Sequence, residues 1–159
     1  MNGYLFNKEK YMYVNGCKPH VECILCAIRD RDPDVTLLEI VRTELSIATV
    51  NLYPFNPGHL MIFPLRHVTD ICDLTDDEAL DIHRLTVRSL TALKADFSPV
   101  GFNLGYNTGL ASGASISHLH QHIVPRFHNE VGFIDVLAGD RVMVVDPVEM
   151  LQKIKRSFV

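Results

Sequence analysis

Three histidines occupy alternate positions in the run His118-Leu119-His120-Gln121-His122. In an extended strand, successive side chains point to opposite faces at about 3.3 Å per residue. We therefore expect the three imidazoles on one face of a β-sheet. Ile116, Ile123 and Val124 beside them favour a strand. Pro125 is expected to end this strand, because proline has no backbone N–H to donate.

The sequence before these histidines predicts a hairpin followed by a helix. Residues 43–52 and 59–63 are two apolar runs separated by Pro, Asn and Gly at 54–58, which is typical of two strands joined by a long loop. Thr75 and the three acidic residues after it have the form of a capping box, and the helix should stop near 97–99. Its core-facing residues are expected to be Ile82, Leu85, Leu90 and Leu93.

The remaining pattern completes an α+β arrangement. Strands are predicted at 101–106 and at Val142–Val145, on either side of the histidine strand, and Pro147 begins a last helix that ends near Phe158. Most strands neighbour one another in sequence, with one helix between hairpins, which favours an antiparallel sheet. A length of 159 residues with 47% hydrophobic content suits a single domain.

Composition narrows the class of partner. A formal net charge of -4 argues against binding to nucleic acid, whose phosphates require a basic surface. We find no signal-peptide pattern and no apolar run of roughly 18 residues, so no membrane association and a cytoplasmic location are expected. Four cysteines, two of them close together, suit a metal site better than a disulfide framework. Cys72 is expected to be a small buried hydrophobe.

A row of histidines can support two kinds of chemistry, or none. Neutral imidazoles can bind a metal ion, or one imidazole can act as a nucleophile while its neighbours hold its tautomer. The loop at 107–115 is rich in Gly, Ser and Asn, and it offers backbone N–H groups and hydroxyls to phosphate oxygens. Together with the histidines, this loop indicates chemistry at phosphorus.

Two motifs and the helix between them resemble a known family. They are Asn51-Leu52-Tyr53-Pro54-Phe55-Asn56-Pro57-Gly58-His59 and the segment from Gly113 to Arg126. From Cys23 to Arg126 the chain is similar to the histidine triad (HIT) superfamily of nucleotide hydrolases and transferases, and within it to bacterial diadenosine tetraphosphate phosphorylases. The resemblance implies an α+β HIT fold: a five-stranded antiparallel sheet with a central helix and a C-terminal helix, in a homodimer. Residues 1–159 would be one HIT domain, with an N-terminal arm (1–30), a core (43–126) and a C-terminal segment (127–159).

The resemblance also implies roles for individual residues. His120 would attack the α-phosphorus of a nucleoside polyphosphate or a related AMP compound and form a nucleotidyl-histidine. His122 would support the triad and contact phosphate, and His59 would complete the relay. The other nucleotide-contacting positions would be Asn51, Asn107, Ser112, Gly113 and Ser115. Water as the second acceptor would give hydrolysis and inorganic phosphate would give phosphorolysis, and the sequence leaves both open.

Cys23 and Cys26 have the spacing of half a zinc site. In zinc-bearing members of the superfamily the partners of such a pair map to His67 and His118, which would make a structural zinc site. A local site using Cys17 and His20 is the alternative, and we favour the distributed one. Because strict alternation puts His118 on the catalytic face, the zinc would have to lie at the edge of that face.

Two other functions stay open on the sequence alone. In one, His118, His120 and His122 all bind a catalytic metal ion, as in a metal-dependent hydrolase. In the other, the chain binds a nucleotide as a regulator with little turnover. The presence of both His120 and His59 favours catalysis.

Overall fold

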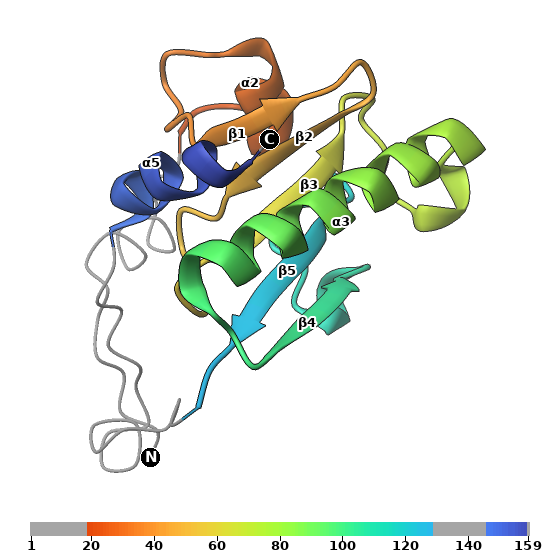
Figure 1. Cartoon of the computed structure of the whole chain (residues 1–159). Coiled ribbons are helices and arrows are strands. Elements are labelled where there is room, and N and C mark those ends of the chain that lie inside the picture. Colours follow the sequence, from red (N-terminus) through yellow and green to blue (C-terminus); the bar gives the residue numbers. More distant parts are fainter. Residues whose placement is uncertain (1–18, 129–145, 159) are drawn as a thin grey trace, which may run out of the picture.

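The structure is a computed structural model that describes residues 19–128 and 146–158, and its strands form one antiparallel sheet in the order β1-β2-β3-β5-β4 (Figure 1). The strands are β1 (Glu39–Arg42), β2 (Ser46–Val50), β3 (Leu60–Pro64), β4 (Gly101–Tyr106) and β5 (Gln121–Arg126). The helices are α2 (Ile24–Asp30), α3 (Asp76–Phe97) and α5 (Pro147–Ser157), with short 3-10 turns η1 (Ile71–Asp73) and η2 (Leu110–Ser112). The α+β class with a five-stranded antiparallel sheet is confirmed. No helix in these described ranges is long and apolar enough to cross a membrane.

The helices α3 and α5 cover one face of the sheet (Figure 1). Thr75 caps α3, because its side chain accepts from the Glu78 N–H while Glu78 accepts from the Thr75 N–H, which confirms the capping box. The apolar stripe of α3 packs on the central strands. The buried core on this face contains Ile82, Leu85 and Leu93 of α3, Ala48, Val50, Leu60, Ile62 and Ile123 of the strands, and Met150 and Ile154 of α5.

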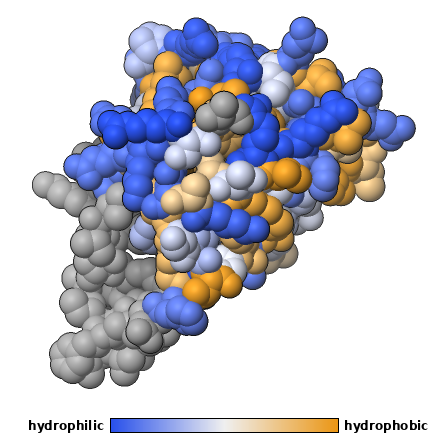
Figure 2. Space-filling model, viewed as in Figure 1, coloured by the Kyte–Doolittle hydropathy of each residue, from blue (hydrophilic) through white to orange (hydrophobic). Residues whose placement is uncertain are grey.

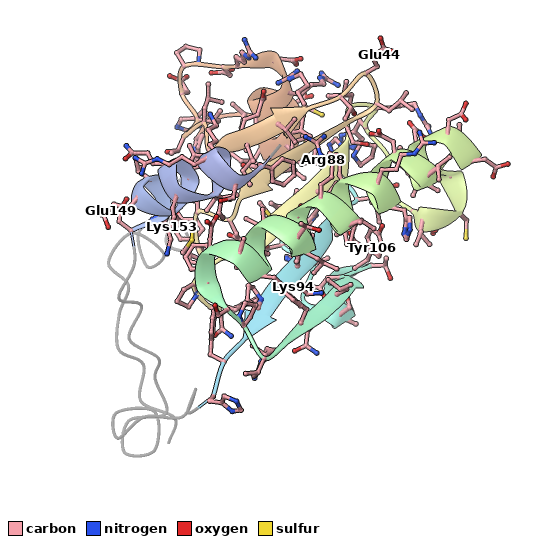
Figure 3. The ribbon with its side chains drawn as sticks, in the orientation of Figure 1. Glu44, Arg88, Lys94, Tyr106, Glu149 and Lys153 are labelled. Carbon is pink, nitrogen blue, oxygen red and sulfur yellow. The ribbon has the colours of Figure 1, made fainter. Side chains whose placement is uncertain are left out.

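Cation–π contacts lock α5 against α3. In Figure 3, Arg88 lies on α3 and Lys153 on α5. The Arg88 guanidinium lies 4.8 Å from the ring centroid of Phe158, and the Lys153 ammonium lies 4.3 Å from that of Phe97. Asp146 and Pro147 begin α5 as an N-cap followed by a first-turn proline, so this predicted helix is confirmed.

The opposite face of the sheet is covered by α2 and carries the polar side chains of Thr49 and His122. Buried side chains of α2 and the loop after it pack on Ile47, Met61 and Phe63, which point away from α3. Met61 is the cross-strand partner of both Thr49 and His122, and partners of this kind share a face of the sheet. His122 therefore lies on the α2 side, while α3 is confined to the other side.

Two elements depart from the expectations. The predicted strand 43–52 is shorter, Ser46–Val50, and forms a hairpin with β1, whose four residues were too few and too polar to recognise. The helix α2 was not predicted at all, since seven residues give almost no periodic signal. The strand predicted at Val142–Val145 lies outside the described residues.

The histidine strand was predicted with the wrong limits at both ends. β5 begins at Gln121, so His118 and His120 precede it, and it continues through Pro125 to Arg126. The Arg126 carbonyl accepts from the Val100 N–H, so backbone groups of Arg126 face β4 and those of Pro125 face the other way. Pro125 thus removes no hydrogen bond to β4, and its carbonyl accepts from the Asn56 amide at 2.6 Å.

Gly58 provides a test of the turn that carries the buried His59. Its φ is +82°, and an added Cβ would lie 2.9 Å from Leu93 Cδ2 and 3.1 Å from Pro125 Cγ. We expect Gly58→Ala to lower the free energy of unfolding by about 1–3 kcal/mol, through backbone strain and overpacking. Chemical denaturation measures the change. Gly101→Ala is the control, since nothing lies within 4 Å of its added Cβ, and an equal loss there would contradict the explanation.

Candidate active site and metal centre

A cavity of about 400 Å³ lies on the sheet face opposite α3. Ile24, Leu25 and Ile28 of α2 form an apolar part of its wall, and His120 and His122 form a polar part. A volume of this size is typical of sites for small organic ligands, which combine apolar walls with a few polar groups.

His120 is buried and contributes to the cavity wall. Its Nδ1 lies 2.8 Å from the carbonyl oxygen of His118, so Nδ1–H donates and the lone pair of the neutral ring is on Nε2. Burial lowers the pKa of His120, although the hydrogen bond to the carbonyl opposes this shift. The ring is therefore neutral near pH 7, which is the form that a nucleophilic imidazole requires.

His59 and His122 form a hydrogen-bonded pair beside it. The Phe55 N–H donates to His59 Nδ1 at 3.0 Å, which places the proton of His59 on Nε2. That Nε2–H donates to His122 Nδ1 at 3.0 Å, so His122 carries its own proton on Nε2. Burial lowers the pKa of His59 to about 3 and that of His122 to about 4, and neighbouring imidazoles add to both shifts. Both imidazoles are therefore neutral. The hydrogen bonds run from the Phe55 N–H to His59 and from His59 to His122.

Most of the predicted nucleotide-contacting residues line the cavity, but Ser112 does not. Asn51, Asn107, Gly113, Ser115 and His122 all line it. Asn107 Nδ2 lies 3.5 Å from His122 Nε2, so two donors could share one acceptor oxygen. By contrast, the Ser112 hydroxyl is 2.8 Å from the carbonyl oxygen of Gly109 and is not part of the lining. His59 is fully buried and also does not line the cavity.

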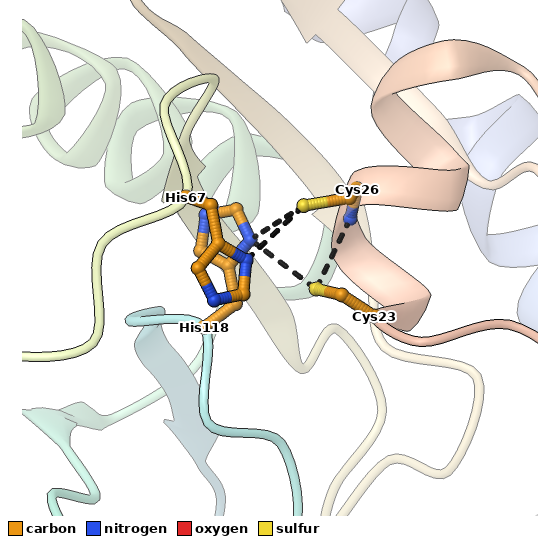
Figure 4. A group of neighbouring side chains, drawn as sticks. All are labelled: Cys23, Cys26, His67 and His118. Carbon is orange, nitrogen blue, oxygen red and sulfur yellow. Dashed lines mark hydrogen bonds between the residues drawn. The ribbon is translucent and has the colours of Figure 1, made fainter.

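Four potential metal ligands meet in one cluster, which consists of Cys23, Cys26, His67 and His118 (Figure 4). Their potential ligand atoms all lie within 4.8 Å of one another. His118 Nδ1 is 3.5 Å from each of the two sulfur atoms, and His67 Nδ1 is 3.2 Å from the Cys26 sulfur. In a tetrahedral zinc site, bonds of about 2.3 Å to sulfur and 2.0–2.1 Å to nitrogen put those atoms about 3.6 Å apart. The spacing of the four side chains fits a zinc ion.

The orientation of His118 supports the same assignment. Its Nε2 lies 3.0 Å from the Pro64 carbonyl oxygen, so Nε2–H donates and the lone pair on Nδ1 faces the sulfur atoms. A backbone acceptor on the second nitrogen is the usual way in which proteins orient a histidine ligand. Burial and the neighbouring Cys23 raise the pKa of Cys26 to about 11, and a bound cation would reverse this by favouring the thiolate.

The geometry separates the alternatives for the metal. Among the described side chains, the group that could share one ion contains His118 but neither His120, His122 nor His20. The Nδ1 atoms of the three triad histidines each face a different partner, which disfavours a single catalytic ion among them. Cys17 lies outside the described residues. The expectation that Cys72 is buried is wrong: it is exposed within η1.

Several cavity residues were missed in the sequence. Asp34 and Thr36 follow α2 and are among the residues that line the cavity. Phe55 also lines the cavity and stacks on His59, with ring centroids 5.0 Å apart. One indication of a role for Phe55 was available in the sequence, since this large apolar residue stands between Pro54 and Pro57 in the predicted turn. No pattern in the sequence indicated that Asp34 and Thr36 belong to this site.

Known proteins resemble the chain in sequence and in fold. A model of the HIT domain family matches residues 30–129. The AP-4-A phosphorylase of Mycobacterium tuberculosis is 41% identical over 107 residues, which cover 67% of this chain and 55% of that protein. The asymmetrical bis(5'-nucleosyl)-tetraphosphatase of Schizosaccharomyces pombe is 38% identical over 85 residues, or 54% of this chain and 47% of that protein. The chain thus spans about half the length of these curated relatives.

A solved structure has the same fold. A zinc-bound histidine triad family protein from Mycobacterium smegmatis superimposes with a TM-score of 0.71 at 23% identity, covering 86% of this chain and 93% of the other.

The four-residue cluster makes a prediction about metal content. We expect about one zinc per chain by elemental mass spectrometry, and loss of that zinc in Cys26→Ser and in His67→Ala, since a structural zinc needs all four ligands. His20→Ala and Cys72→Ser serve as controls and should keep the metal. Loss of zinc in His20→Ala would instead support the local site.

The hydrogen bonds also predict the tautomers of His59, His120 and His122. Long-range ¹⁵N–¹H NMR should find the proton of His120 on Nδ1, and those of His59 and His122 on Nε2. His59 and His122 should stay neutral from about pH 8 to about pH 5, because lowered pKa values of about 3 and about 4 lie below that window. A His59 protonated on Nδ1, or charging above about pH 6, would show that the donor order is different.

Proposed function

We propose that this chain, which belongs to the HIT domain family, is an enzyme that cleaves nucleotides at the α-phosphorus through a nucleotidyl-histidine on His120. One observation carries the proposal: the Nδ1–H of His120 donates to the His118 carbonyl, which leaves a lone pair on Nε2 in a ring that lines the cavity. A neutral, oriented imidazole beside a site for a small ligand is equipped for nucleophilic attack.

The proposed reaction has two displacements. In the first, Nε2 of His120 forms a bond to the α-phosphorus, and the bond from phosphorus to the bridging oxygen breaks and releases the remaining phosphates as an anion. In the second, water or inorganic phosphate attacks the same phosphorus, its proton is lost to solvent, and the bond to Nε2 breaks. AMP or ADP leaves, and His120 returns to its neutral form. The covalent intermediate divides one difficult displacement into two easier ones.

In this reaction His122 contacts the phosphate, and His59 positions His122. The order of donors puts a proton on His122 Nε2, close to the Asn107 amide, where both can donate to an oxygen of the reacting phosphate. His59 lies behind His122 and does not line the cavity, so it acts through its hydrogen bond to His122. We assign Gly113 and Ser115 to the phosphate and Asn51 to the ribose, and the presence of all three in the cavity wall supports this assignment.

The substrate class follows from the relatives. We take the substrate to be a nucleoside polyphosphate such as diadenosine tetraphosphate, because a phosphorylase and a tetraphosphatase of such compounds match this chain. The phosphorylase is the more similar of the two, at 41% identity, and we therefore propose inorganic phosphate as the second acceptor.

Zinc and a second subunit belong to the same proposal. Cys23, Cys26, His67 and His118 would hold a structural zinc, which joins segments that are distant in sequence. We propose that the homodimer forms along β4, which lies at the edge of the sheet, and along α3. Leu104 of β4 and Val87 of α3 are 47% and 51% exposed, and Figure 2 shows hydrophobic residues at the surface of this side among hydrophilic ones.

Intact-mass analysis tests the nucleophile. After brief incubation with diadenosine tetraphosphate, the unmodified protein should gain one acid-labile AMP, and inorganic phosphate should discharge it as ADP. His120→Ala should form no adduct and lose about 10³-fold or more in turnover, because no other described imidazole has its Nε2 lone pair at the cavity.

The control and the contrary outcomes are equally direct. His83→Ala removes an exposed histidine of α3 and should form the adduct normally. Discharge of the adduct only to AMP would identify a hydrolase. If no adduct forms and turnover is lost on removal of metal and restored by its return, a metal-dependent hydrolase is favoured. If the protein binds the nucleotide but forms no product, a regulator is favoured.

A further inference from the structure

The helix α2 has two roles in one short segment. Its residues Ile24, Leu25 and Ile28 line the cavity. Cys23 at its N-cap and Cys26 in its first turn belong to the candidate metal site, the cluster of Cys and His side chains described above. Two potential metal ligands and three cavity residues therefore fall within the six positions 23–28. A displacement of the two sulfur atoms would move the apolar wall of the cavity with them.

Helix α2 has few other attachments. A helix of seven residues is not stable on its own in water, so its position depends on what it contacts. Among the described residues, its attachments include the apolar packing on Ile47, Met61 and Phe63, one hydrogen bond from Arg29 to the Leu65 carbonyl at 2.9 Å, and the Cys and His side chains of the candidate metal site. Its C-cap residue Arg31 also makes a 3.5 Å ion pair with Glu39 of β1, in which Arg31 is exposed.

The histidine side of the cavity is held differently. The Leu119 N–H donates to the Val68 carbonyl at 2.6 Å, and His118 Nε2–H donates to the Pro64 carbonyl at 3.0 Å. Directly afterwards the chain enters β5, which is paired on both sides. None of these contacts uses a potential ligand atom of the metal site. We therefore expect the backbone around His120 to keep these hydrogen bonds when the metal is removed.

From this asymmetry we propose that the metal centre controls nucleotide affinity by holding α2 as the apolar wall of the cavity, and that it leaves the nucleophile in place. The inference rests on the proposed function in one respect, that the cavity binds a nucleotide. The apolar wall is the part suited to a base, because it buries hydrophobic area, and the polar wall is the part suited to phosphate.

Binding of AMP to the zinc-loaded protein, the chelated protein and Cys26→Ser tests this directly by calorimetry. Loss of the metal should weaken AMP binding at least tenfold. Hydrogen exchange at 24–30 should accelerate while exchange at 82–93 in α3 stays unchanged, and the His120 proton should remain on Nδ1 by NMR. If turnover is measured, KM should rise while kcat changes less than threefold.

Cys72→Ser is the matched control, since it replaces an exposed thiol outside the cluster, and its AMP affinity should equal that of the unmodified protein. If chelation leaves AMP affinity within twofold, or if α3 loses protection together with α2, the proposal is wrong. If the zinc-loaded protein does not bind AMP at all, both this inference and the proposed function are wrong. If Cys26→Ser fails to fold, the chelated protein decides.

Discussion

The buried imidazole of His118 is the contact on which the arrangement of the site depends. Its Nε2–H donates to the Pro64 carbonyl at the end of β3, its Nδ1 faces the two sulfur atoms, and its own carbonyl accepts from His120. One residue thus connects the sheet, the candidate metal site and the proposed nucleophile. Because both ring nitrogens have partners, the imidazole can lie fully buried without an unsatisfied donor or acceptor in the ring.

The two faces of the sheet divide structural and chemical roles. Every residue of β2 and β3 is buried, and alternation sends Ala48 and Ile62 toward α3 but Thr49 and Met61 toward the cavity. The α3 face carries an apolar core with no part in the proposed reaction. The other face can therefore hold polar groups, such as the buried His59 and the half-buried His122, in a hydrogen-bonded network on a rigid support.

Helices with strong local sequence signals were predicted correctly. Helices and strands whose positions depend on tertiary contacts were not. The capping box at Thr75 and the proline at the start of α5 located two helices. The spacing of Cys23 and Cys26, together with the family resemblance, indicated the four side chains that the structure brings together as a candidate metal site. The short α2 and β1 were missed because their positions come from packing, which a sequence does not display. The hydroxyl of Ser112 illustrates the same limit, since only the structure shows it bonded within its own turn.

The histidine pattern was informative for a reason that differs from the one first inferred. Alternation predicted a strand through all three residues, yet β5 begins only at Gln121. Within a sheet, the His118 carbonyl would be occupied by a neighbouring strand, as backbone acceptors there generally are. Because His118 precedes the strand, its carbonyl can accept from the ring of His120 instead, and this contact leaves the lone pair on Nε2. The interruption of regular structure just before β5 is therefore what allows the backbone to orient the proposed nucleophile.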